Sequence, residues 1–114
     1  PARKIVIGSN RWQSPDTFDA LKVPANDPNI ILSFHFYTPM ALTHYQASWT
    51  SLGKYTGPIN YPGEIITAEE LGKLDAQLQK DLAYTLGQWD RAKLAKLMEK
   101  PIKIAKETGL PLYC

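Results

Sequence analysis

The residues best suited to chemistry lie in one aromatic stretch of the sequence, Phe34-His35-Phe36-Tyr37. If this stretch is a strand, His35 and Tyr37 face the same side of it, because alternate side chains of a strand share a face. Two polar rings there could hydrogen-bond a reacting group, or they could be core residues whose hydrogen bonds are satisfied internally. The long irregular segment that follows, residues 38–66, favours a site, because loops of that length in compact domains are usually functional.

Further aromatic residues accompany this stretch. His44 and Trp49 lie in the segment 38–66, and Trp12 follows the first apolar run of the chain. Aromatic faces suit stacking on the apolar C–H faces of sugar rings, so these three residues are candidate ligand-binding residues. The alternative is a loop whose aromatic side chains pack on one another as a small core.

The composition excludes several classes of protein and site. Thirteen basic and eleven acidic residues are interspersed, which leaves no electrostatic footprint for nucleic acid or an anionic membrane. The single cysteine excludes an internal disulfide, and the two histidines lack a carboxylate at metal-ligand spacing. No apolar run approaches the ~20 residues that span a bilayer, and the first residues lack the order of a signal peptide. We therefore expect no metal, no cofactor, no nucleic acid and no membrane partner.

Hydrophobic patterning predicts an α/β fold. Continuous apolar runs are typical of strands buried on both faces, and amphipathic stretches with leucines three and four residues apart are typical of helices. The predicted strands lie near residues 4–8, 30–37 and 110–114, and the predicted helices near 15–21, 68–86 and 91–108. This alternation is typical of parallel βαβ units, whose right-handed crossovers place the three strands side by side.

Local signals mark the expected helix ends. Thr67 and Glu70 form a capping-box pattern, and Asp90 can cap a second helical segment. Pro101 is expected to kink or restart that segment, because proline has no N–H to donate, and Gly109 is expected to end it. The carboxylates on or beside the helices are interpreted as caps and solvated faces rather than as a paired acid and base.

The stretch His35-Phe36-Tyr37-Thr38-Pro39, followed by Thr43-His44 and Trp49, resembles glycoside hydrolase family 5, whose endoglucanases and mannanases are (β/α)8 barrels. It is similar to the family's His-aromatic-Tyr-x-Pro motif at the end of barrel strand six and to Thr-His-x-x-x-x-Trp in the next loop. Residues 3–8 with Trp12 resemble strand five, and residues 109–114 resemble strand seven. The resemblance implies that residues 1–114 form part of a (β/α)8 TIM barrel.

The resemblance also implies roles for individual residues. His35 and Tyr37 would flank the catalytic carboxylates, with Tyr37 placed to hydrogen-bond the nucleophile. Trp12, His44 and Trp49 would line the substrate cleft. Retaining enzymes of this kind use two glutamates ~5–5.5 Å apart. In the family the acid/base would precede residue 1 and the nucleophile would follow residue 114, so we expect no catalytic glutamate within these residues.

The leading interpretation is part of a retaining endo-β-1,4-glucanase (cellulase), secreted or periplasmic, whose 114-residue segment is inactive alone. The preference among cellulose, mannan and xyloglucan is left open. Two alternatives are a non-catalytic carbohydrate-binding module and a half-barrel made for the study of folding or assembly. Because three strands cannot close a barrel and edge strands expose unpaired backbone groups, we also expect self-association or assembly with complementary barrel fragments.

Overall fold

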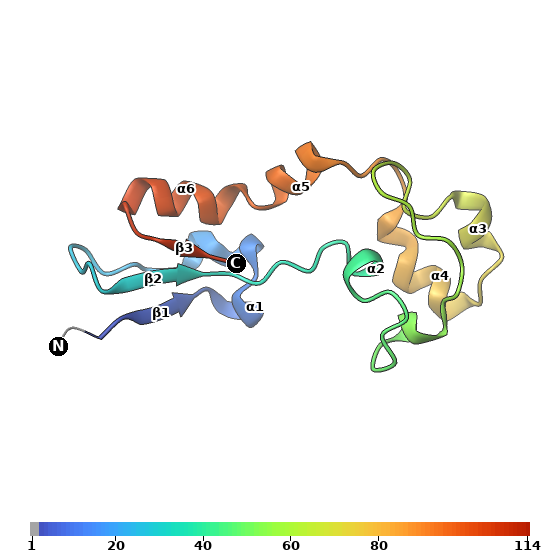
Figure 1. The fold of residues 1–114 in the computed structure, drawn as a ribbon, viewed down its shortest axis with the longest axis horizontal. Helices are drawn as coiled ribbons and strands as arrows, with labels where there is room; N and C mark the ends of the chain where they lie inside the picture. The colour runs from blue at the N-terminus through green and yellow to red at the C-terminus, as the bar shows by residue number, and fades with distance from the viewer. Residues whose placement is uncertain (1–2) are drawn as a thin grey trace. The chain divides into compact units, whose positions relative to one another are not determined.

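The computed structural model of the chain describes residues 3–114, which form two compact units (Figure 1). The first, which we call the sheet unit, comprises residues 3–36 and 95–114. The second, the helical unit, comprises residues 37–94.

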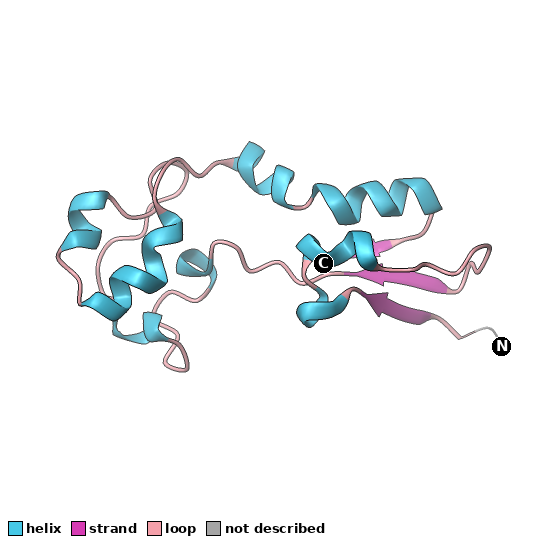
Figure 2. Ribbon diagram, turned by 180° about the vertical axis from the view of Figure 1, so that it is seen from behind, coloured by secondary structure: helices cyan, strands magenta, loops and turns pink. Residues whose placement is uncertain are grey.

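The sheet unit contains three parallel strands in the order β1-β2-β3 (Figure 2). They are β1 (Ile5–Gly8), β2 (Ile30–Ser33) and β3 (Leu112–Tyr113). Ile5 is opposite Ile30, and Leu32 is opposite Leu112. The predicted α/β class, with three parallel strands side by side and helices between them, is confirmed.

Two helical elements complete the core of the sheet unit. They are the 3-10 helix η1 (Pro15–Ala20) and α6 (Glu99–Thr108), which contact each other. Phe18 of η1 is fully buried and meets Phe34 edge to face, with ring centroids 6.4 Å apart. Ile30 and Leu32 of β2 are buried in the same cluster. Burial in the core therefore explains the apolar residues on one face of this segment, whereas Ile31 on the other face is only partly buried.

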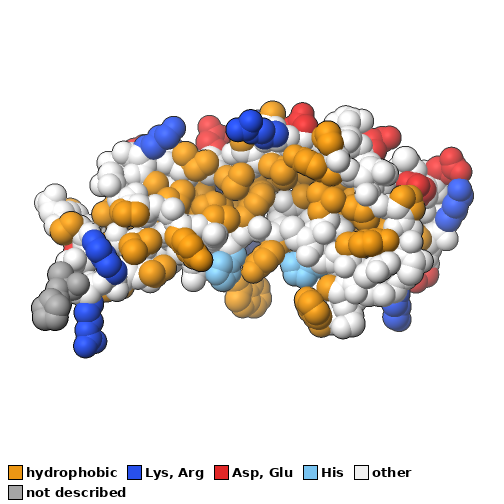
Figure 3. All heavy atoms as spheres, viewed as in Figure 1, with side chains coloured by type: hydrophobic (Ala, Val, Ile, Leu, Met, Phe, Trp, Pro, Cys, Tyr) orange, Lys and Arg blue, Asp and Glu red, His pale blue; other side chains and the backbone are white. Residues whose placement is uncertain are grey.

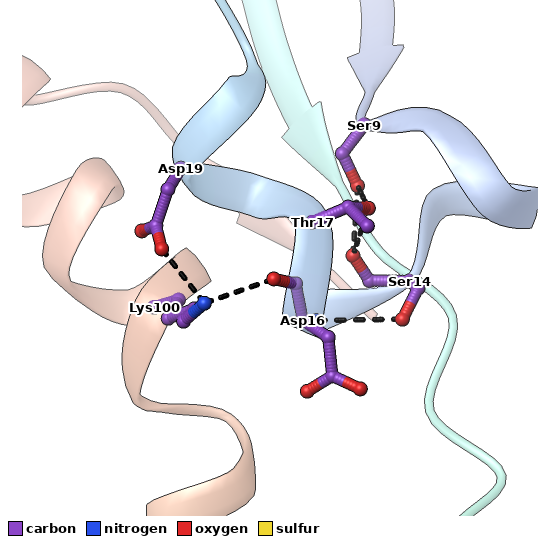
Figure 4. Close-up of polar contacts among 6 residues, drawn as sticks. All are labelled: Ser9, Ser14, Asp16, Thr17, Asp19 and Lys100. Atoms are coloured by element: carbon purple, nitrogen blue, oxygen red, sulfur yellow. Dashed lines mark hydrogen bonds and ion pairs between the residues drawn. The ribbon is translucent and has the colours of Figure 1, made fainter.

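A polar junction joins η1 to α6 (Figure 4). The Lys100 ammonium donates to the Asp16 carbonyl at 2.9 Å and lies 2.7 Å from an Asp19 carboxylate oxygen. The hydrogen bond from Lys100 to Asp19 raises the pKa of the lysine. Ser14 caps η1 by accepting the Asp16 N–H, with proline at the first position of the helix, where no N–H is needed.

Between β1 and η1 lies the short turn α1 (Asn10–Gln13), which is left-handed. Arg11, Trp12 and Gln13 have φ of 51°, 55° and 61°, a region that residues other than glycine rarely adopt. The Ser14 N–H donates to the carbonyls of Asn10 and Arg11, both at 3.2 Å, and closes the turn. The sequence of this turn contains no glycine that would have signalled it.

The helical unit contains five short elements of its own. They are α2 (Met40–Thr43), η2 (Ser51–Lys54), α3 (Ala68–Gly72), α4 (Ala76–Leu82) and η3 (Ala83–Thr85). A further helix, α5 (Arg91–Leu97), links the two units in sequence. Ile65, Ile66 and Leu82 are fully buried, so the segment 38–66, predicted to be irregular, contributes to a core.

A backbone pairing closes the helical unit. Gly63 and Trp89 exchange two N–H···O hydrogen bonds of 2.8 Å each. The Trp89 ring is buried and donates its Nε1–H to the Thr85 carbonyl at 2.9 Å. Two stretches far apart in sequence are thereby joined within this unit.

The structure differs from the predicted helix over 68–86, because α3, α4 and η3 occupy that range as separate elements. The Asp75 carboxylate accepts the Leu78 N–H at 2.9 Å and starts a new helix. The leucine spacing continues through this break, which is why periodicity alone predicted one helix. The break expected in 91–108 is present, because α6 begins at Glu99. Pro101 lies in the first turn of α6, where the N–H that proline lacks would have no intrahelical partner.

The strands are shorter than predicted, whereas the helix caps agree with the prediction. β2 ends at Ser33 rather than at residue 37, because the next free N–H, that of His35, donates to the Gln13 carbonyl of the α1 turn. β3 is limited to Leu112–Tyr113. The Asp90 carboxylate accepts the Lys93 N–H, and Gly109 ends α6 with φ 69°.

The capping box at the start of α3 predicts a pH-dependent contribution to stability. Glu70 accepts the Thr67 N–H at 3.0 Å and the Thr67 hydroxyl at 2.9 Å, and these two hydrogen bonds lower the pKa of Glu70 from its ordinary value. Because the folded-state pKa is lowered, the contribution is present above the ordinary carboxyl pKa and is lost as the pH falls through the folded value. We expect Glu70→Ala to lower the melting temperature near pH 7 and to lower it less near pH 3.

Glu70→Gln is the matched control, because glutamine can still accept the Thr67 N–H but does not titrate. Its effect on the melting temperature should be smaller than that of alanine near pH 7. An equal loss for Glu70→Ala at both pH values would contradict the assignment.

Candidate functional site

Three of the predicted site residues form one aromatic cluster in the helical unit. Tyr37 and His44 meet edge to face with ring centroids 5.2 Å apart, and His44 meets Trp49 in the same way at 6.5 Å. Such edge-to-face pairs are a favourable aromatic geometry. We call these three residues the aromatic cluster.

The helix α2 positions the aromatic cluster. It brings Thr43 back to the start of the segment, where the Thr43 hydroxyl donates to the Tyr37 carbonyl at 2.7 Å. Tyr84 holds the beginning of α2, because its hydroxyl accepts the Ala41 N–H at 3.1 Å. Partial burial raises the pKa of Tyr84, so this hydroxyl stays protonated and neutral around neutral pH.

The rings of the cluster differ in exposure. Trp49 is 80% exposed and Tyr37 is 56% exposed, whereas His44 is half-buried. Histidine and hydrophobic side chains also reach the surface on the face drawn in Figure 3. A tryptophan ring held by its neighbours and open to solvent is well suited to stack on a sugar ring.

The alternative interpretation, a loop that packs its aromatic residues as a small core, is correct for Tyr55. Tyr55 is 2% exposed, its hydroxyl donates to the Pro58 carbonyl, and burial raises its pKa. Tyr45 meets Tyr55 at 6.2 Å and donates to the Gly57 carbonyl. Tyr45 itself is 40% exposed, so of the two only Tyr55 is a core residue, in contrast to Trp49.

The other two predicted residues, Trp12 and His35, belong to the sheet unit. Trp12 is 90% exposed on the left-handed turn α1. The Gln13 carbonyl accepts the His35 N–H at 3.0 Å, which joins that turn to the end of β2. Both residues therefore follow the carboxyl ends of neighbouring parallel strands, the edge at which α/β folds place their sites.

The position of Trp12 depends on a strained and closely packed backbone. Three successive left-handed residues cost roughly 1–3 kcal/mol each, and such strain persists only where the surroundings impose it. A Cβ atom on Gly8 would lie 2.6 Å from Gln13 Cγ, so glycine allows Gln13 to fold back against the strand. The turn thus presents the indole to solvent in a defined place.

Sequence reasoning missed three residues that organise these positions. Thr43 contacts both Tyr37 and His44, Tyr84 holds α2, and Gln13 ties the α1 turn to His35. Only Thr43 carried a signal, because it stands beside His44 in the quoted motif. The other two act through contacts that sequence spacing does not show.

Most carboxylates of the chain are engaged in local structure. Each of the following accepts a hydrogen bond or forms an ion pair: Asp19, Asp27, Glu69, Glu70, Asp75, Asp81, Asp90 and Glu107. That is eight of the eleven acidic residues. The prediction of caps and solvated faces concerned the carboxylates on or beside the helices of residues 64–107. Of these, Glu70, Asp75 and Asp90 are caps, and Glu69, Asp81 and Glu107 make exposed contacts.

Within residues 3–114 there is no group of three or more histidine, cysteine or acidic side chains that could hold a metal ion. No helix in this range is long and apolar enough to cross a membrane. A cavity of about 760 Å³ is lined by residues 23–28 and 107–111, which include none of the predicted site residues.

Comparison with known proteins agrees with the motif. The sequence profile described as "Cellulase (glycosyl hydrolase family 5)" matches residues 1–112. Endoglucanase C of Acetivibrio thermocellus is 29% identical over 113 residues, which is 98% of this chain and 33% of the relative. Endoglucanase C307 of Clostridium sp. (strain F1) matches to the same extent. Cellodextrinase A of Ruminococcus flavefaciens is 27% identical over 110 residues, which is 96% of this chain and 26% of the relative. The chain therefore spans a third or less of the length of these relatives.

The contrast in burial between two tryptophans predicts opposite effects on stability. Trp49→Ala removes a ring that is 80% exposed, so the free energy of unfolding should change by less than about 0.5 kcal/mol. Trp89→Ala removes a ring that is 3% exposed, hydrogen-bonded to Thr85 and covered by Lys93 at 3.8 Å, and should cost about 3–5 kcal/mol. Urea unfolding of both variants measures the difference, and equal losses would show that Trp49 is a core residue.

Proposed function

Since the chain belongs to the cellulase family, glycosyl hydrolase family 5, we propose that it forms part of the catalytic barrel of a retaining endo-β-1,4-glucanase. The observation that carries the proposal is the exposed aromatic cluster, which follows the carboxyl end of β2 in the chain. The exposed Trp12 after β1 and the parallel strand order add to this support.

The reaction would proceed by two displacements at the anomeric carbon. In the first, one glutamate attacks that carbon and forms a glycosyl ester while the other protonates the departing oxygen. In the second, water gives a proton to that other glutamate, now a base, as its oxygen attacks the anomeric carbon and releases the first glutamate as a carboxylate. We propose that Tyr37 donates its hydroxyl proton to the nucleophilic carboxylate. Such a hydrogen bond favours the charged carboxylate, the form that can attack. His35 is proposed to flank the catalytic carboxylates.

The two glutamates are proposed to come from parts of the barrel other than residues 1–114. The engagement of six carboxylates in helix caps and ion pairs, and of two more in other hydrogen bonds, supports this, because those groups already serve local structure. The chain would then supply the aromatic and polar groups around the substrate.

The substrate is proposed to be a β-1,4-linked glucan. The names of the relatives, endoglucanase and cellodextrinase, support this class. Trp12, His44 and Trp49 would bind its sugar rings by stacking and hydrogen bonding. Because a polymeric glucan does not cross a membrane, the enzyme is proposed to be secreted or periplasmic.

The assay of the proposed function uses the protein in its natural length with soluble cellulose, and counts new reducing ends. Tyr37→Phe should lower kcat roughly ten- to a hundredfold, because a hydrogen bond to a charged group is lost. Trp49→Ala should raise KM roughly two- to tenfold through the lost stacking. Tyr61→Phe is the control, since Tyr61 is also partly exposed in the helical unit and has no proposed role.

The 114-residue polypeptide alone should give no new reducing ends under the same conditions, because both glutamates are proposed to lie elsewhere in the barrel. Turnover by this polypeptide would refute that placement. An intact natural-length protein that leaves β-1,4-glucans uncut would refute the proposed function.

We further propose that the sheet edges are covered by other barrel strands or by a second copy of the chain. Among the described residues, β1 and β3 each pair with β2 alone. Ile5 and Val6 are more than half exposed, as is Tyr113. Exposed, unpaired strands of this kind readily add another strand.

Native mass spectrometry of the 114-residue polypeptide tests this proposal. We expect multiples of 12.8 kDa, and one-to-one complexes when the complementary barrel segments are added. A strictly monomeric species that unfolds cooperatively would show that the edges need no cover.

A further inference from the structure

The Thr43 hydroxyl makes two polar contacts and has only one proton. Its Oγ1 lies 2.7 Å from the Tyr37 carbonyl oxygen and 2.9 Å from His44 Nδ1. A carbonyl oxygen can only accept. The hydroxyl proton is therefore directed to the Tyr37 carbonyl.

The direction of this hydrogen bond determines which ring nitrogen of His44 carries a proton. With its proton committed, Thr43 Oγ1 can only accept from Nδ1, and two lone pairs facing each other at 2.9 Å would repel. Nδ1 must then carry a proton. In the neutral imidazole the second nitrogen, Nε2, consequently has a free lone pair and is a hydrogen-bond acceptor.

The surroundings leave this acceptor available to a ligand. Within residues 3–114, no hydrogen bond to His44 Nε2 is found, and the one buried side-chain N or O without a partner is Gln13 Oε1. Nε2 therefore reaches solvent. The rings of Tyr37 and Trp49 stand beside the imidazole at 5.2 and 6.5 Å and limit its movement.

We propose that Thr43 is a positioning residue that holds His44 as the Nδ1–H tautomer, so that Nε2 accepts a hydrogen bond from a substrate hydroxyl. The nature of the ligand rests on the proposed function. A pyranose ring stacked on Trp49 carries its equatorial hydroxyls around its rim, and those on the side of the imidazole can donate to Nε2. The cluster would thus combine an apolar face with one acceptor that requires an O–H donor.

The first test is the ¹⁵N NMR spectrum of the histidine rings in the protein of natural length. The His44 resonances are identified by their loss in His44→Gln. In the unaltered protein and in Thr43→Ser, we expect the pyrrole-type shift at Nδ1 and the pyridine-type shift at Nε2. In Thr43→Val, which lacks the hydroxyl, the proton should move to Nε2. A pyridine-type Nδ1 in the unaltered protein would overturn the inference, whatever the activity.

The second test is the kinetics of the same variants on soluble cellulose. Thr43→Val should raise KM roughly three- to tenfold, the effect of one hydrogen bond, with little change in kcat. Thr43→Ser should restore KM. Thr43 is exposed, so Thr43→Val should keep its melting temperature, which separates a positioning role from a merely structural one.

The two tests separate failure of this inference from failure of the proposed function. The expected tautomer with an unchanged KM in Thr43→Val would overturn the contact between His44 and substrate. The expected tautomer in a protein without activity on any β-1,4-glucan would uphold the pairing of Thr43 with His44 and refute the proposed function.

Discussion

The sheet unit is organised around β2, the central strand, whose inner face is buried. This strand has a hydrogen-bonded neighbour on each side, and Ile30, Leu32 and Phe34 are at most 3% exposed. These three side chains are two residues apart and share one face of the segment, whereas Ile31 on the other face is only partly buried and Ser33 is polar. Beyond Phe34 the His35 N–H leaves the sheet and donates to the Gln13 carbonyl. The polar rings of His35 and Tyr37 are exposed only beyond the paired strand.

The helical unit meets a different constraint, because a long insertion must offset the conformational entropy lost when it is ordered. It does so with its own core of Ile65, Ile66 and Leu82 and with the backbone pairing between Gly63 and Trp89. Since this core is complete without Trp49, that ring is left outside it. Exposure of Trp49 is therefore compatible with a stable unit.

Features encoded by neighbouring residues were predictable from the sequence. The capping box of Thr67 and Glu70 and the αL residue Gly109 depend on contacts within a few residues, and they occur as predicted. The division of 68–86 into three elements was not predictable, because two local signals conflict. The leucine spacing favours one continuous helix, whereas the Asp75 carboxylate caps a new helix, and the structure follows the cap. The α1 turn and the Gly63–Trp89 pairing carry no local signal, since tertiary contacts impose both.

The same distinction applies to the candidate site. Residue types and spacing identified Tyr37, His44 and Trp49, which the structure brings together, but could not reveal that Tyr55 of the same segment is buried. Nor could spacing reveal proton direction, which follows only when the distances of Thr43 Oγ1 to its two partners are known. Aromatic and motif patterns in the sequence therefore indicate which groups face a ligand. The hydrogen-bonding character that each group presents depends on the three-dimensional network around it.

The distribution of charge within the chain follows from these structural demands. Acidic side chains cap α3, α4 and α5 or pair with lysines, because carboxylates near a helix N-terminus are stabilised by its free N–H groups. The groups placed in the candidate site are instead rings of tyrosine, histidine and tryptophan. Neutral donors and acceptors can surround a carboxylate pair without adding a third negative charge, which would raise the pKa of both acids. In the proposed barrel these rings would therefore act on the reacting acids through hydrogen bonds, as proposed for Tyr37, and not through an added negative charge.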